Sequence, residues 1–224
     1  MAQPPTLRVS EIFYSLQGES SRAGYPCLFI RMADCNLRCS YCDARYTYEE
    51  PGQSYRLEEI MSALAAATPH GQAVELVEVT GGEPLLQEGV YPLLDTLLAR
   101  GHQVLLETNG SRSLARLPAA VRCIMDIKCP ASGMSEHWLP ANLKRLTGND
   151  EIKFVVSDRG DYDWAKELLN RYHLTGNGPT LTFSPVADRL AAAELAAWLL
   201  ADALPARLQL QLHTQLWPDH RRGY

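Results

Sequence analysis

The chain of 224 residues has 21 basic and 26 acidic side chains, a formal net charge of −5, and 46% hydrophobic residues. This composition provides a core for a globular domain but no broad positive face, which argues against a dedicated nucleic-acid-binding protein. No apolar run reaches the roughly 18 residues of a membrane span, and residues 1–10 contain no apolar stretch, so we expect neither a membrane segment nor a signal peptide.

Short β-rich runs alternate with helical patterns along the chain. Apolar residues recur at helical spacing from Arg56 to Leu64, from Val90 to Leu97, from Ala165 to Tyr172, and in an alanine-rich stretch through Trp198. The connection 131–150 is polar and has a weak helical signal at 136–144. The predicted strands are 7–14, 27–32, 74–80, 103–108, 121–127, 151–156, 180–184 and 207–213.

Strands that alternate with helices predict right-handed βαβ units and a parallel sheet. Six predicted strands lie between residues 27 and 184, and a seventh lies near the C-terminus. This number falls short of a complete eight-stranded barrel. We therefore predict an α/β fold with an open, partial (β/α)6 barrel. No linker, repeat or low-complexity tract is present, so residues 1–224 are expected to form a single domain.

The most informative motif is Cys35-Asn36-Leu37-Arg38-Cys39-Ser40-Tyr41-Cys42, three thiols at C-x₃-C-x₂-C spacing directly after a predicted strand. Zinc sites usually have four protein ligands, and no fourth Cys or His lies nearby. Thiolates at this spacing also suit an iron–sulfur cluster, and three of them leave one iron open to an amine and a carboxylate of a small molecule.

The other three cysteines lack ligand spacing, so a second cluster is not expected; they are Cys27, Cys123 and Cys129. The uneven spacing of all six does not indicate a disulfide framework, and a tight thiol triplet needs a reducing compartment. We therefore expect a cytoplasmic protein.

Most predicted strands end in polar or glycine-containing sequence. Each end alone is explained by the need for a turn. The carboxyl ends of parallel strands meet at one edge of a sheet, however, so together they predict a ligand pocket beside the thiols. The ends are Gly81-Gly82-Glu83, Glu107-Thr108-Asn109, Asp126-Ile127-Lys128, Ser184 and His213.

The cysteine motif, with Tyr41 before the third thiol, and the Gly81-Gly82-Glu83 segment resemble the radical S-adenosylmethionine (SAM) superfamily. The resemblance implies that Cys35, Cys39 and Cys42 hold a 4Fe–4S cluster whose open iron binds SAM. In this superfamily, cleavage of SAM provides a radical that removes a hydrogen atom from the substrate. The positions implied to contact SAM are Tyr41, Gly81, Gly82, Glu83, Glu107, Asn109, Asp126, Lys128 and Ser184.

Several other segments resemble the 7-carboxy-7-deazaguanine synthases, radical SAM enzymes of 7-deazapurine (queuosine precursor) biosynthesis. These segments are Ser15-Leu16-Gln17-Gly18-Glu19, Cys42-Asp43, Asp126-Ile127-Lys128-Cys129-Pro130 and Gln211-Leu212-His213. The resemblance implies a lyase that converts 6-carboxy-5,6,7,8-tetrahydropterin to 7-carboxy-7-deazaguanine and releases ammonia.

The same resemblance implies that the pterin substrate is surrounded by Gln17, Gly18, Glu19, Arg31, Thr80 and His213. The amide and carboxylate of Gln17 and Glu19 suit the donor and acceptor edge of a pterin, and Arg31 can pair with a substrate carboxylate through two parallel bonds. On residue type alone, Arg31 could instead form a surface ion pair, and His213 could be a hydrogen-bonded core histidine.

The family resemblance also implies Mg²⁺, an electron donor such as flavodoxin or ferredoxin, and a homodimer. Relatives commonly have a hydroxyl residue after Cys-Asp that helps to bind magnesium, whereas Ala44 has no oxygen to give. Water or substrate oxygens can complete the magnesium octahedron in its place. Two other departures are Ser20 in place of a glycine and Thr214 in place of a lysine.

Two alternatives stay open at this point. A glycyl-radical-enzyme activase shares the cysteine spacing but acts on a protein backbone, and the Gln17-Gly18-Glu19 segment, the Asp126–Pro130 segment and His213 argue against it. A non-catalytic iron–sulfur or zinc binding module would share the thiols alone.

Overall fold

The computed structural model describes residues 6–69, 74–218 and 222–223. The expectation that the first ten residues form no signal peptide concerns residues 1–5 as well, and these lie outside the described residues. The described strands form one nine-stranded sheet in the order β3-β1-β2-β4-β5-β6-β7-β8-β9. From β2 to β9 each neighbouring pair is parallel, whereas β1 runs antiparallel to both β2 and β3.

The strands are β1 Leu7–Leu16, β2 Pro26–Met32, β3 Gln53–Tyr55, β4 Leu76–Gly81, β5 Gln103–Thr108, β6 Arg122–Asp126, β7 Glu151–Val156, β8 Thr180–Pro185 and β9 Arg207–Leu208. The α-helices are α1 Tyr46–Glu49, α2 Leu57–Ala67, α3 Val90–Ala99, α4 Arg159–Arg171, α5 Ala192–Ala201 and α6 Leu212–Leu216. Short 3₁₀ helices are η2 Pro84–Leu86, η3 Pro130–Ser132 and η4 Pro140–Lys144.

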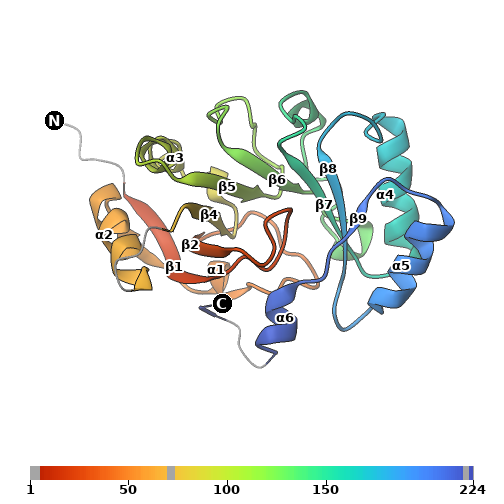
Figure 1. Ribbon diagram of the computed structural model, residues 1–224, viewed down its shortest axis with the longest axis horizontal. Coiled ribbons are helices and arrows are strands. Elements are labelled where there is room, and N and C mark those ends of the chain that lie inside the picture. The colour runs from red at the N-terminus through yellow and green to blue at the C-terminus, as the bar shows by residue number, and fades with distance from the viewer. Residues whose placement is uncertain (1–5, 70–73, 219–221, 224) are drawn as a thin grey trace.

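The architecture confirms the predicted partial barrel. The six strands expected between residues 27 and 184 are β2 and β4 to β8. Figure 1 shows the strands in an arc from β1 to β9, with α2 and α3 beside one end of the sheet and α4 and α5 beside the other. Helix α6 lies at the open side of this arc, below β2 in the view.

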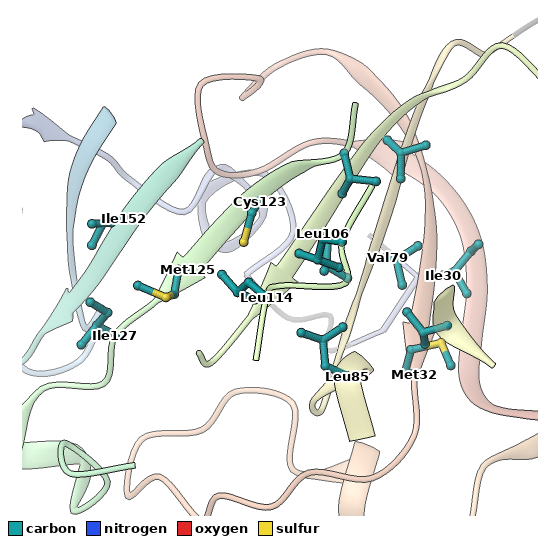
Figure 2. Packing of buried hydrophobic residues seen from close by; sticks show 14 of the residues in the cluster. Ile30, Met32, Val79, Leu85, Leu106, Leu114, Cys123, Met125, Ile127 and Ile152 are labelled. Carbon is teal, nitrogen blue, oxygen red and sulfur yellow. The ribbon is translucent and has the colours of Figure 1, made fainter. Parts of the chain in front are cut away.

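The main hydrophobic core lies between the sheet and the helices. Every second residue of the parallel strands points to it, as the period of a strand requires. Figure 2 shows Ile30, Val79, Leu106 and Met125 side by side on four neighbouring strands, and all four are fully buried. Burial of such side chains contributes roughly 1.5–3 kcal/mol each and ties the helices to the sheet.

The opposite face of the sheet points into the barrel. Its lower part is a small apolar cluster of Phe13, Cys27, Phe29, Leu76, Leu105 and Ile124. Phe13 and Phe29 stack with ring centroids 4.8 Å apart. Toward the carboxyl ends of the same strands this face carries polar side chains, which can bind a ligand.

The predicted strand 207–213 is wrong in extent. Strand β9 contains only Arg207 and Leu208, and Leu212 and His213 belong to α6. The last ladder bond runs from the Gln209 amide to the Phe183 carbonyl, at 2.9 Å. Leu208 and Leu210 are 37% and 38% exposed, so these two leucines do not pack into a core, and the pairing of β9 with β8 ends here.

The weak helical signal at 136–144 corresponds only to η4. Pro140 explains the difference, because a proline fits the first turn of a helix but not its interior. The short elements α1 and β3 were not predicted. No helix among the described residues is long and apolar enough to span a membrane.

Candidate active site

The three motif cysteines lie in the loop between β2 and α1, and each is partly buried. Burial raises the pKa of the thiols of Cys35, Cys39 and Cys42, and the ammonium group of Lys128 opposes this by lowering them. Lys128 therefore favours the thiolate forms that a cluster needs. In residues 6–69, 74–218 and 222–223, no three His, Cys, Asp or Glu side chains gather around one metal position. A 4Fe–4S cluster does not require its thiolates to gather around one metal position, because each thiolate binds a different iron.

The cysteine loop is held against the far strands of the barrel. The Ser40 amide donates to the Ser132 carbonyl at 3.0 Å, and the Ser40 hydroxyl donates to the Ala131 carbonyl at 2.8 Å. The hydroxyl of Tyr41 donates to the Val155 carbonyl at 3.0 Å, at the end of β7. These contacts tie the cysteine loop to η3, which follows β6, and to the end of β7.

The glycine pair after β4 allows this loop to pack. A Cβ atom at Gly82 would lie 1.9 Å from the Asp34 carbonyl oxygen, and one at Gly81 would lie 2.3 Å from the Met32 carbonyl oxygen. Gly81 also has φ of +132°, which favours glycine. The described neighbours of both glycines are therefore in the backbone that leads to Cys35, and the implied contact of this pair with SAM stays a prediction.

Glu83 connects the ends of two neighbouring strands, β4 and β5. Its carboxylate is fully buried and accepts bonds from the Thr108 hydroxyl at 2.8 Å, the Asn109 amide at 2.7 Å and the Leu85 amide at 3.0 Å. Burial raises the pKa of Glu83, and these bonds oppose the rise. The Glu83 side chain thus holds the residues after β4 against the end of β5. Its implied contact with SAM stays a prediction.

Asn109 faces the cysteine loop. Its side-chain amide donates to Asn36 Oδ1 at 3.2 Å and lies 3.9 Å from the Cys35 sulfur. Asn109 Oδ1 accepts from the Ser111 backbone amide at 2.9 Å. The end of β5 therefore touches the first thiol of the motif.

A buried lysine is the hub of the barrel interior. Lys153 on β7 has a side chain only 5% exposed, and its ammonium group lies 2.5 Å from Glu19, 2.6 Å from Glu107 and 3.5 Å from Asp126. The Thr80 hydroxyl donates to the other oxygen of Glu107 at 2.9 Å. Although burial opposes it, the Lys153 ammonium group lowers the pKa of Glu107 to about 2, so this carboxylate stays ionised.

Asp126 and Lys128 continue the network toward the thiols. The Lys128 ammonium donates to Asp126 Oδ2 at 2.8 Å, and Asp126 is the main cause that raises the pKa of Lys128 against the effect of burial. Lys128 therefore keeps its charge at neutral pH. One chain of ion pairs runs from Glu107 through Lys153 and Asp126 to Lys128.

Several buried polar atoms on the inner face have no protein partner. They include Asp126 Oδ1 on β6 and the hydroxyl groups of Thr182 and Ser184 on β8. Asp126 pairs in register with Lys153, and Lys153 with Thr182, so these residues share the inner face. Buried polar atoms are usually hydrogen-bonded. These atoms could bind a hydroxylated ligand, and the expected contacts of Asp126 and Ser184 with SAM stay a prediction.

Arg31 lies on β2, next to Thr80 in the ladder. Its Nε donates to Glu11 Oε1 at 2.8 Å, and the Tyr46 hydroxyl donates to the same oxygen at 2.7 Å. The pKa of Arg31 is raised by Tyr46, Glu11 and Asp43, which outweigh the effect of burial. The ion pair on the Nε edge orients the guanidinium plane.

The Gln17 side chain is only 3% exposed. Its carbonyl oxygen accepts from the Glu19 amide at 3.0 Å, and its amide nitrogen donates to Glu78 in the middle of β4. Gln17 thus shapes the loop between β1 and β2, residues 17–25, which we call the hairpin loop. A direct bond from this side chain to a pterin stays a prediction.

The hairpin loop meets the C-terminal segment. The Gln211 side-chain amide donates to Glu19 at 2.9 Å, and the Leu212 amide donates to the Gly18 carbonyl at 3.0 Å. A Cβ atom on Gly18 would lie 2.7 Å from His213 Nδ1, so only glycine allows this approach. The contact brings together Gly18, Glu19 and His213, and their expected binding of a substrate stays a prediction.

The structure also places residues that sequence reasoning missed, among them Lys153, Glu78, Glu11 and Tyr46. The sequence contains a signal for Lys153 and Glu78, because a charged residue inside an apolar strand is seldom buried without a partner.

Ala44, which follows Cys42-Asp43, is 9% exposed, and the Thr47 hydroxyl donates to the Ala44 backbone carbonyl at 2.8 Å.

Comparison with known proteins gives a consistent result. Residues 29–127 match the model of the radical SAM superfamily. The chain is 42% identical over 230 residues to a 7-carboxy-7-deazaguanine synthase of Koribacter versatilis, covering 97% of this chain and 100% of that protein. It is 44% identical to a protein of the same name from Chlorobaculum tepidum, with 100% of both chains covered.

Among solved structures, the fold is similar to that of QueE from Escherichia coli. The TM-score is 0.75 at 25% sequence identity, and the alignment covers 92% of this chain and 94% of that one.

Proposed function

This chain belongs to the 7-carboxy-7-deazaguanine synthases of the radical SAM superfamily, and we propose that it converts 6-carboxy-5,6,7,8-tetrahydropterin to 7-carboxy-7-deazaguanine and ammonia. The reaction makes it a carbon–nitrogen lyase. Neither the glycyl-radical activase nor the binding module is favoured by these relatives.

The observation that carries the proposal is that two sets of residues meet in one barrel interior. The cysteine loop, with Lys128 and Asp126 beneath it, lies at the mouth. Thr80 and Glu19 lie further along the interior and are joined by Glu107 and Lys153, and Arg31 stands beside Thr80 in the ladder. This arrangement supports the proposal that a cofactor and a polar substrate bind side by side.

The proposed cofactor residues follow from the donor set. Cys35, Cys39 and Cys42 would hold a 4Fe–4S cluster, and the unpaired oxygens of Asp126 and Ser184 would accept from the hydroxyl groups of SAM. When bound, cluster and SAM supply the radical chemistry that removes a hydrogen atom from the substrate. The protein provides the orientation and a water-poor interior for it.

The proposed substrate residues carry complementary charge. A pterin presents amine and ring N–H donors along one edge and, in this substrate, a carboxylate on the other ring. Glu19 is a carboxylate acceptor for the donor edge, and the Arg31 guanidinium is a partner for the carboxylate. Glu11, itself bound by the Tyr46 hydroxyl, accepts from Arg31 Nε, and this pairing orients the other guanidinium nitrogens for a ligand.

Magnesium, a flavodoxin or ferredoxin as reductant, a homodimer and a cytoplasmic location are further parts of this proposal. Ala44 has no side-chain oxygen, and the Thr47 hydroxyl donates to the backbone. We therefore expect any magnesium ion to bind mainly through substrate and water oxygens.

The experiment is anaerobic incubation of the reconstituted protein with SAM, a chemical reductant, magnesium and the carboxylated pterin. Mass spectrometry should detect the deazaguanine, and an ammonia assay should give an equal amount. An activase would instead cleave SAM only with a partner protein, and a binding module would not cleave it at all; either result contradicts the proposal.

A further inference from the structure

Glu78 occupies an unusual position in the barrel. It lies in the middle of β4 and is 4% exposed. In the ladder it stands between Phe29 of β2 and Leu105 of β5, both members of the inner apolar cluster. A carboxyl group in such surroundings is costly to bury unless it serves a partner.

That partner is the hairpin loop. The Gln17 side-chain amide donates to Glu78 Oε2 in a buried contact between residues 61 positions apart. Gln17 also forms the base of the loop, because its backbone carbonyl accepts from the Gly24 amide and its amide donates to the Tyr25 carbonyl, both at 2.8 Å. Its side-chain oxygen accepts from the Glu19 amide. The carboxyl group of Glu78 therefore fixes the residue from which Gly18 and Glu19 project.

The charge state suits this role. Burial and then the nearby Glu107 raise the pKa of Glu78 to about 8, although the bond from Gln17 opposes the rise. The charged or titratable groups that face it are Glu107 on β5, Glu19 in the loop, Lys153 on β7 and Cys27 on β2. A neutral Glu78 accepts from Gln17 without adding a further negative charge beside Glu107 and Glu19.

We propose that Glu78 is a positioning residue for substrate recognition: its carboxyl group anchors Gln17 and thereby sets the place of Gly18 and Glu19 against His213. This inference rests on the proposed function, because the hairpin loop is taken to bind the pterin. It assigns a role in the reaction to a residue that no motif contains.

Two of the contacts that hold the hairpin loop to the barrel wall differ in kind. The Lys153 ammonium holds the Glu19 carboxylate, whereas Glu78 holds the Gln17 amide. The first acts on a group expected to touch the substrate. Glu78 instead acts through Gln17, which does not itself carry the expected substrate contact of Glu19. Loss of the Glu78 carboxyl group should therefore displace the hairpin loop and leave the cysteine loop in place.

The test compares E78A and E78Q with the wild-type enzyme at about pH 7. E78A removes the acceptor, and E78Q keeps an oxygen acceptor in nearly the same volume and neutral form. D150N is the control, because Asp150 is equally buried but accepts from the Cys123 and Thr147 amides outside the site. Each variant is measured for the KM of the pterin, the KM of SAM, kcat and the melting temperature.

We expect E78A to raise the KM of the pterin about tenfold, the effect of one lost buried hydrogen bond, while the KM of SAM stays the same. E78Q should restore the wild-type KM, and D150N should change only the melting temperature. The Q17A/E78A double variant should be no worse than Q17A alone.

Three results would overturn the inference: equal changes in both KM values for E78A, unchanged kinetics with a lower melting temperature, or E78Q as impaired as E78A. Failure of the proposed function would look different, because the wild-type enzyme would then not convert the pterin at all.

Discussion

The Lys153 ammonium lies 2.6 Å from Glu107 Oε1, although β6 separates the strands to which the two residues belong. The lysine side chain passes Asp126 of β6 at 3.5 Å on the way. On the other side it contacts Glu19 of the hairpin loop at 2.5 Å. One cation thus links three carboxylates from three separate parts of the chain, in the interior where the substrate is proposed to bind.

Replacing this cation should be costly. In K153M three carboxylates lose a buried partner, and we expect the free energy of unfolding to fall by about 3–5 kcal/mol. Urea unfolding monitored by circular dichroism measures it. The control is K166M. The Lys166 ammonium pairs with Asp202, and both side chains are 29% exposed. The loss of this exposed pair should lower the free energy of unfolding by less than about 1 kcal/mol. Equal losses in the two variants would contradict the role of Lys153 as a hub.

Glu78 should make stability depend on pH. Its pKa is raised to about 8 in the folded chain by burial and by Glu107, whereas an unfolded glutamate titrates near ~4.3. The folded state therefore binds this proton more tightly, and the contribution of Glu78 to stability falls as pH rises from ~4.3 to about 8. E78Q does not titrate.

The melting temperature of E78Q should consequently exceed that of the wild type by a margin that grows between about pH 5 and pH 8. Differential scanning calorimetry at several pH values measures the margin. A constant difference across this range would show that Glu78 titrates normally.

The cysteines should separate into two groups. C35A, C39A and C42A should each lose the cluster, seen as loss of bound iron, of inorganic sulfide and of visible absorption after anaerobic reconstitution. C27A, C123A and C129A should keep it, because these three thiols are fully buried in or beside strands and act as small apolar groups. Loss of iron in C123A, with its circular dichroism unchanged, would overturn the ligand assignment.

Arg31 should act on the substrate more than on SAM. R31A removes the guanidinium that Glu11 and Tyr46 orient, and the lost charge-assisted bond to the substrate carboxylate should weaken pterin binding by roughly 1.5–3 kcal/mol. The KM values of the pterin and of SAM, measured separately, test this. E11Q, which leaves the guanidinium in place but removes its ion pair, should have a smaller effect in the same direction. If R31A weakened both ligands alike, Arg31 would be structural.

Much of the fold follows from the sequence because the strands are short apolar runs of period two with clear turn residues at their ends. Strands β5 and β7 have the predicted bounds, and the cysteine loop lies directly after β2. The edge of the sheet was harder, because the run 207–213 alternates like a strand but has no second face to bury.

The contacts inside the barrel could not be predicted in the same way. Gln17 reaches Glu78 only because the hairpin of β1 and β2 places the loop beneath β4, and a local pattern does not contain this relation. The partners of Glu83 and Lys153 depend likewise on which strands are neighbours. The sequence does indicate that charged residues inside apolar strands need partners, but it does not tell which partners they have.

The contact between Gly18 and His213 gives the last prediction. Gly18 has no left-handed backbone, so an added methyl group is limited only by His213, whose Nδ1 would lie 2.7 Å away. G18A should therefore push the imidazole aside and raise the KM of the pterin several-fold, with little change in the melting temperature. Steady-state kinetics with the pterin as the varied substrate measures the effect.

G24A is a matched control in the same loop, because Gly24 has φ of +88° and nothing within 4 Å of an added Cβ. It should cost about 1 kcal/mol of stability through backbone strain and leave the pterin KM unchanged. If displacement of the imidazole is the cause, adding G18A to H213A should have little further effect, since only the 3.3 Å contact with the His213 backbone nitrogen then remains. Additive losses in the double variant would instead mean that Gly18 acts independently of His213, for example through its own backbone contact with the substrate.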